Sequence, residues 1–185
     1  TALDFSPTLL DELRETLLQI DRHEGLGLAD KVTLVKEDIR HFSSHLPRPV
    51  ELVVCMGDTL AHLEDVEQVQ ELLAMAKDAL EPGGRLLLSF RDQSRELTGA
   101  DRFLALRSEP DRLHTVFLEY TPTHITVYDL FHCQHEEGWE LSKSAFRKVR
   151  LTRDGVREVL EGLGMSLVHD SMERGMVWME AQVAR

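Results

Sequence analysis

Continuous apolar runs that alternate with amphipathic segments constrain the fold of this chain most strongly. Residues 50–55 read VELVVC and residues 85–90 read RLLLSF, and each run ends abruptly at polar residues. The segment between them carries apolar residues at the spacing of one helix face: Val69, Leu72, Leu73, Ala76 and Leu80. Strands that are apolar throughout and alternate with such helices indicate a parallel sheet covered on both faces. We therefore expect an α/β fold in which VELVVC is a buried strand.

The first forty residues add a strand, a helix and a second strand. Residues 1–3 are β-prone, Ser6 is suited to the N-cap position and Pro7 to the first helical position. Gly25 closes the helical region, and residues 32–39, VTLVKEDI, are expected to form a strand that ends near Asp38. The order β, α, β continues the pattern of the central region.

The pattern changes after residue 113, where long β-like stretches replace the alternation. Residues 114–120, 125–133 and 139–151 are separated by turn sequences and predict antiparallel strands. A helix capped by Thr152 and a terminal hairpin follow these strands. Earlier in the chain, a turn is expected at Pro82-Gly83-Gly84, before RLLLSF. We expect one domain over residues 1–185, with the strands of residues 114–151 as a lid or an extension of the sheet. Tyr120, Tyr128 and Trp139 are the aromatic candidates for such a cover.

Composition narrows the class of partner. The 185 residues contain 21 Lys and Arg against 33 Asp and Glu, a net charge of −12, which argues against nucleic acid and anionic membrane surfaces. A small molecule fits better as ligand. Cys55 and Cys133 predict reduced thiols and a cytoplasmic protein, and no apolar run approaches the roughly 20 residues that span a bilayer. The oligomeric state stays open, with a homo-oligomer as one alternative.

Polar residues follow each expected strand at its carboxyl end. In open α/β sheets ligands bind at that edge, so Asp4, Asp38, Gly57-Asp58 and Arg91 are expected to line one rim. Asp4 is placed to accept hydrogen bonds from ribose hydroxyls, and Asp38 to accept one from an exocyclic amine such as that of adenine. A turn aspartate and a solvated loop carboxylate are the structural alternatives.

Four sequence blocks in this order resemble the class I S-adenosylmethionine-dependent methyltransferases across nearly the whole chain: TALDFSP, KEDI, VELVVCMGDTLAHL and LEPGGRLLLSFRD. The resemblance implies a Rossmann-like methyltransferase fold, a mostly parallel, doubly wound sheet with antiparallel C-terminal strands. The pattern C-x-G-x-[ST]-x-x-H-L, followed by an Arg past the next strand, is most similar to the glycine N-methyltransferase group. The implied activity is methyl transfer from S-adenosylmethionine to a nitrogen or oxygen atom of a small molecule.

The same resemblance implies roles for individual residues. The residues implied to bind the cofactor are Asp4, Phe5, Asp38, Ile39, Cys55, Met56 and Gly57. Asp58 and His62 match catalytic positions, and Arg91 matches an Arg that binds the substrate carboxylate. Because the group carries an Asn where this chain has Asp58, an anionic acceptor such as glycine is expected to be repelled. The alternatives are that His62 starts a helix and that Arg91 pairs with Asp92.

The glycine-rich loop that follows the first strand of this family is not in the sequence, because Thr1 stands where the second strand would begin. Three explanations are open. The chain is the C-terminal part of a longer protein, which we favour, another chain supplies the strand, or the fold is rearranged and has lost cofactor binding. The last would make the protein a non-catalytic interaction module. A nicotinamide dehydrogenase fits the terminal strands poorly, and a zinc site at His132-Cys133-x-His135 is not expected because neighbouring strand residues point to opposite faces.

Overall fold

The computed structural model describes residues 1–184. The strands are β1 (Ala2–Asp4), β2 (Leu34–Lys36), β3 (Val50–Cys55), β4 (Leu80–Arg91), β5 (Phe103–Glu109), β6 (Arg112–Tyr120), β7 (His124–His135), β8 (Gly138–Val149), β9 (Ser166–Glu173) and β10 (Met176–Gln182). The helices are α1 (Pro7–Glu24), α2 (Leu28–Lys31), α3 (Val66–Ala79) and α4 (Arg153–Gly162), with 3₁₀-helices η1 (Ile39–His45), η2 (Thr59–His62) and η3 (Gly99–Arg102). The chain divides into two compact units, residues 1–50 and residues 51 onward.

The unit of residues 1–50 holds the parallel pair β1–β2, against which α1 packs. The expected start of α1 is confirmed, since Ser6 is the N-cap, its side chain accepts a hydrogen bond from the Leu9 amide, and Pro7 opens the helix. Gly25 ends the helix with a φ of 65°, a left-handed conformation that favours glycine. Strand β2 is shorter than expected and ends at Lys36, because Asp38 instead accepts a hydrogen bond from the Arg40 amide and caps η1.

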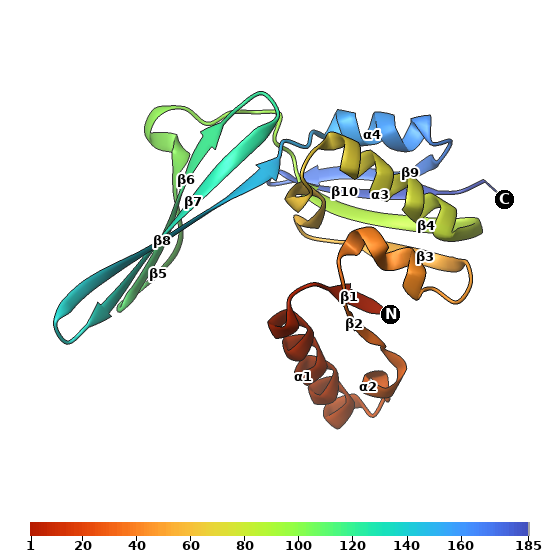
Figure 1. The fold of residues 1–185 in the computed structure, drawn as a ribbon, viewed down its shortest axis with the longest axis horizontal. Coiled ribbons are helices and arrows are strands. Elements are labelled where there is room, and N and C mark those ends of the chain that lie inside the picture. The colour runs from red at the N-terminus through yellow and green to blue at the C-terminus, as the bar shows by residue number, and fades with distance from the viewer. Residues whose placement is uncertain (185) are drawn as a thin grey trace. The chain divides into compact units, whose positions relative to one another are not determined.

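The second unit is built on a four-stranded sheet in the order β3-β4-β10-β9. Strand β10 pairs antiparallel with both β4 and β9, which confirms the terminal hairpin. Helix α3 contacts β4, α4 contacts β9, and the two helices contact each other on one face of the sheet (Figure 1). The core on that face consists of buried side chains from the strands and helices: Leu86, Leu88, Phe90, Val177, Met179, Ala181, Val69, Leu72, Leu73, Val156 and Leu160.

The expectation that VELVVC is a buried strand is wrong in part. Strand β3 forms as expected, but the side chains of Leu52 and Val54 are 49% and 51% exposed. The physical reason is position, because β3 is the edge strand of its sheet. An apolar run therefore predicted the strand but not the burial of each of its side chains.

The four strands between residues 103 and 149 form a separate antiparallel sheet in the order β5-β6-β7-β8. The three expected strands are confirmed as β6, β7 and β8, and sequence reasoning missed β5. Val116, Ile125 and Val127 form a small core at one end of this sheet, with Leu118 and Tyr120 packed against it.

The expected turn residues Pro82-Gly83-Gly84 lie within the twelve residues of β4 and not before the strand. The Gly83 amide donates to the Ala184 carbonyl, and the Val183 amide donates to the Gly84 carbonyl. These hydrogen bonds pair the glycines with the C-terminal segment, while Gly83 keeps a φ of 82°, the left-handed conformation typical of a turn residue that follows proline.

Candidate functional site

The candidate site begins where β3 ends. Gly57 has a φ of 75°, and a side chain built there would meet no atom within 4 Å, so the backbone turns beside open space. The Gly57 amide donates to the hydroxyl of Ser89 at 2.7 Å. Ser89 lies on the neighbouring strand β4 and is buried. The hydrogen bond therefore holds the turn after β3 against the next strand of the sheet.

Both oxygens of the Asp58 carboxylate accept hydrogen bonds. The Arg91 amide donates to Oδ1 at 3.0 Å, and the Lys148 ammonium donates to Oδ2 at 2.6 Å. The side chains of Lys148 and Asp58 are only 18% and 17% exposed. Burial raises the pKa of Asp58, but the hydrogen bonds and charges of Lys148 and Arg91 outweigh it and lower that pKa below 3.8. Asp58 is therefore an ionised carboxylate whose charge is offset by a lysine.

His62 ends the short helix η2, which the buried residues Leu60 and Ala61 anchor. Its ring stacks on Phe146 with centroids 5.5 Å apart and an interplanar angle of 27°. Partial burial lowers the pKa of His62 below 6.5, the charge of Lys148 lowers it further, and the Asp58 carboxylate opposes both. At neutral pH the ring is therefore uncharged and can accept a proton.

The side chains that contact His62 and Asp58, Phe146 and Lys148, both belong to strand β8. Phe146 and Lys148 are two residues apart, so they project from the same face of the strand. Lys148 Nζ also lies 5.5 Å from the centre of the Phe146 ring. The two contacts place one face of the antiparallel sheet against Asp58 and His62.

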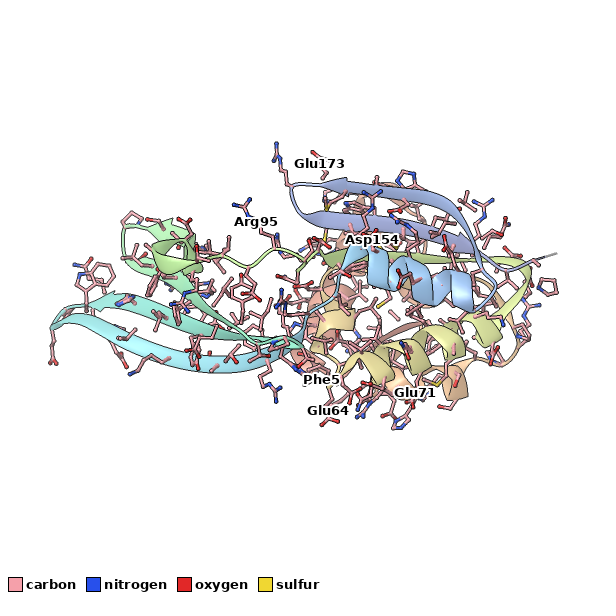
Figure 2. The ribbon with its side chains drawn as sticks, turned by 90° about the horizontal axis from the view of Figure 1, so that it is seen from above. Phe5, Glu64, Glu71, Arg95, Asp154 and Glu173 are labelled. Carbon is pink, nitrogen blue, oxygen red and sulfur yellow. The ribbon has the colours of Figure 1, made fainter. Side chains whose placement is uncertain are left out.

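The base of the antiparallel sheet is fixed to the rest of its unit by polar contacts. His124 Nε2 on β7 lies 2.7 Å from the carbonyl oxygen of Glu64, which follows η2 and is labelled in Figure 2. Arg150 pairs with the Glu96 carboxylate at 2.5 Å and donates to the Gln93 carbonyl. Gln93 and Glu96 lie on the segment between β4 and η3, which also carries the labelled residue Arg95 (Figure 2).

The three aromatic residues expected to cover the rim have other contacts. Tyr120 packs on the small core and lies beneath Arg150, with 5.6 Å from Arg150 Cζ to the ring centre. The Tyr128 hydroxyl donates to Glu119, and Trp139 is exposed near the start of β8. Phe146 and Lys148 make the contacts with η2 instead.

The residues predicted to bind the nucleoside part of the cofactor lie in the first unit. Asp4 ends β1, and its Oδ1 accepts the Ser6 amide at 2.7 Å, while Phe5 is 73% exposed. The Arg40 side chain donates hydrogen bonds to both carboxylate oxygens of Asp38, and these bonds lower the pKa of Asp38 to about 2. Ile39, the first residue of η1, is partly buried. Within this unit, β1 contacts η1, so the chain brings the two strand ends near each other.

Cys55 and Met56 precede the turn at Gly57. Burial raises the pKa of the Cys55 thiol to about 11, so this thiol is protonated at neutral pH. Met56 is exposed, and its carbonyl accepts the Thr59 hydroxyl at 2.9 Å. Cys55 and Cys133 form no disulfide.

Sequence reasoning missed Ser89, Phe146 and Lys148. Ser89 carried a weak signal, since it is the polar residue within the apolar run RLLLSF. Lys148 carried none, because 90 positions separate it from Asp58. No group of three or more His, Cys, Asp or Glu side chains within residues 1–184 could hold a metal ion.

No protein-family model and no curated protein sequence matches this chain. Solved structures do match. An S-adenosylmethionine-dependent methyltransferase from Clostridium acetobutylicum has a TM-score of 0.75 and 14% identity, over 100% of this chain and 74% of that one. The CcbJ methyltransferase from Streptomyces caelestis has a TM-score of 0.77 and 16% identity, over 99% and 74%. The chain has the Rossmann-like methyltransferase fold.

A third similar structure has been solved with the cofactor bound. The glycopeptide N-methyltransferase MtfA, solved with S-adenosylmethionine, has a TM-score of 0.63 and 21% identity, over 100% of this chain and 72% of that one. The same enzyme is also known with S-adenosylhomocysteine and with sinefungin. The predicted fold class is thus confirmed, and the described strands form three sheets.

Among residues 1–184 there is no helix with both the length and the apolar character needed to cross a membrane.

Proposed function

We propose that the protein transfers a methyl group from S-adenosylmethionine to a nitrogen or oxygen atom of a small molecule. The observation that carries the proposal is the turn after β3, where open space beside Gly57 is followed at once by Asp58 and His62. This turn lies at the carboxyl end of a strand, where folds of this class bind ligands. A nitrogen acceptor is favoured, because two proteins of similar fold are N-methyltransferases, the sugar N-methyltransferase KedS8 and the glycopeptide N-methyltransferase MtfA.

We assign the cofactor contacts residue by residue. Asp4 would accept hydrogen bonds from the ribose hydroxyls, with Phe5 beside it, and Asp38 with Ile39 would contact the adenine. The backbone of Cys55, Met56 and Gly57 would pass the methionine part. The structure offers one test of fit at Gly57, where the absence of a side chain leaves room for a ligand. The ionised carboxylate of Asp38 suits an amine donor.

When bound, S-adenosylmethionine supplies a methyl group attached to a sulfonium sulfur, and the lone pair of the acceptor attacks the methyl carbon as the carbon–sulfur bond breaks. The acceptor therefore needs an unprotonated nitrogen or oxygen. His62 is uncharged at neutral pH and would take the proton from the acceptor. Residues 114–151, most of which belong to strands β6–β8, would act as a lid that excludes water.

Charge at the site modifies the expectation drawn from Asp58 alone. The sequence predicts that this carboxylate repels anionic acceptors. Lys148 offsets its charge at 2.6 Å, and Arg91 adds a second positive charge at the end of β4. We therefore propose that Asp58 does not exclude an acceptor that carries a carboxylate, and that Arg91 binds this group.

Isothermal titration calorimetry of the full-length protein with S-adenosylhomocysteine tests the proposal. We expect binding, and we expect Asp4→Ala to weaken it, because the variant removes the acceptor for the ribose hydroxyls. Asp11→Ala is the matched control, since Asp11 is an exposed aspartate on α1 that pairs only with Arg14 in the described contacts. Absence of heat with both S-adenosylhomocysteine and S-adenosylmethionine would refute the enzyme assignment.

A non-catalytic interaction module is the second candidate. It is favoured by the exposure of Leu52 and Val54 on the edge strand β3, since an apolar edge is a surface for pairing with another chain. This candidate predicts no cofactor binding by the full-length protein, so the same calorimetry separates the two.

A further inference from the structure

Lys148 contacts Asp58 from strand β8, 90 positions away in the sequence. Its ammonium donates to Asp58 Oδ2 at 2.6 Å, and it lies 5.5 Å from the centre of the Phe146 ring. The other neighbour of that ring is His62, stacked at 5.5 Å. Lys148 is thus in direct contact with one proposed catalytic residue and shares an aromatic neighbour with the other.

We propose that Lys148 is a positioning residue that holds the Asp58 carboxylate and favours the uncharged form of His62 when the antiparallel sheet lies against η2. The inference rests on the proposed function, and it adds the residue that keeps the proton acceptor ready. Lys148 itself would not touch the reacting atoms. It acts through Asp58, whose carboxylate it holds, and through the field that it exerts on the imidazole.

The charged groups around His62 come from several elements. Asp58 precedes η2 and favours the protonated ring, whereas Lys148 on β8 disfavours it. On β4, Arg91 binds Asp58 through its backbone amide and adds a further positive charge beside that carboxylate. His124 on β7 contacts the carbonyl of Glu64 rather than the His62 ring. Burial has the largest effect on the pKa of His62, and among the charged groups Lys148 and Asp58 act on it in opposite directions.

The origin of Lys148 has a functional consequence. Asp58 lies at the end of β3, but Lys148 belongs to the strand β8 of the second sheet. Loss of the contact between β8 and η2 would remove the positive charge and leave the Asp58 carboxylate next to His62. The ring would then bind a proton more readily, so the uncharged form of His62 that accepts a proton would be less populated. Readiness for catalysis is thereby linked to the position of the lid.

Proton NMR titration of the histidine rings in the full-length protein tests the proposal without cofactor or acceptor. The chain has 9 histidines, so the His62 resonance is assigned by comparison with His62→Gln. We expect His62 to titrate below 6.5 in the parent protein. Lys148→Met should raise its pKa, and Lys148→Arg should restore the low value because a positive charge returns. Asp58→Asn should move the pKa in the opposite direction, downwards.

Lys143→Met is the matched control, because Lys143 is an exposed lysine of β8 an odd number of residues away and so faces the other side of the sheet. An unchanged His62 titration in Lys148→Met, or the same shift in Lys143→Met, overturns the proposal. Should Lys148→Met fail to fold, Asp58→Asn decides, since an upward shift there contradicts the assigned signs. The calorimetry described above tests the proposed function separately, so a failure of one is distinguishable from a failure of the other.

Discussion

The ion pair between Asp58 and Lys148 should contribute measurably to the stability of the second unit. A double-mutant cycle with Asp58→Asn and Lys148→Met isolates it, since each change keeps the shape of the side chain and removes its charge. Exposed pairs contribute about 0.2–1 kcal/mol, and breaking a fully buried pair costs about 3–5 kcal/mol. With side chains 17% and 18% exposed and a separation of 2.6 Å, this pair lies between those limits. We expect a coupling free energy of about 1–3 kcal/mol.

Urea denaturation followed by tryptophan fluorescence is a suitable assay. Trp139 and Trp178 are the two tryptophans, and both lie in the unit that holds the ion pair. Trp139 reports on β8 and Trp178 on β10, so coincident transitions by fluorescence and circular dichroism would justify a two-state treatment of this unit.

The pH dependence gives the sign of the effect. The pKa of Asp58 in the folded protein lies below its ordinary value of 3.8. The stabilisation is therefore fully present above 3.8 and is lost as the pH falls through the lower, folded-state pKa. A coupling below about 0.3 kcal/mol at neutral pH, or one that persists unchanged in acid, would refute the reasoning, because additive mutations agree to roughly that limit.

Three further predictions concern the acceptor, a thiol and a helix cap. Arg91→Ala should weaken acceptor affinity more than cofactor affinity, and equal losses in calorimetry with the two ligands would remove Arg91 from the acceptor site. Cys55 should react slowly with a disulfide reagent at pH 8, since a pKa of about 11 leaves about one thiolate in a thousand; the rate should rise in urea, and a fast reaction of the folded protein would contradict its burial. Thr152→Ala should lower the free energy of unfolding by about 1 kcal/mol, because it removes the side chain that accepts the Gly155 amide; Thr152→Ser should retain most of that stability in urea denaturation.

Much of the local structure could be read from the sequence because its causes are local. Ser6 and Pro7 predict the start of α1, and Thr152 predicts that of α4, since a cap depends on residues within one turn. The alternation of apolar strands with helices predicted the fold class that the similar structures confirm. The positions of Gly57, Asp58 and His62 at a strand end were predicted for the same reason.

Features that depend on neighbours distant in sequence could not be predicted. VELVVC has the composition of a buried strand, yet Leu52 and Val54 are exposed because β3 is an edge strand, and strand order is not encoded in any one strand. The glycines at 83 and 84 predict a turn, and Gly83 has the positive φ of one, but the pairing with the C-terminal segment that includes them in β4 could not be predicted locally.

The charge of the site divides in the same way. By itself the sequence determined that a carboxylate, Asp58, follows β3 and that His62 follows it by four residues. Only the tertiary structure decided the surroundings that set the charge states of these two groups, because Lys148 contacts Asp58 from 90 positions away and the Phe146 ring stacks on His62. A pKa depends on the charges and the burial around a group in space, and spacing along the chain does not specify them.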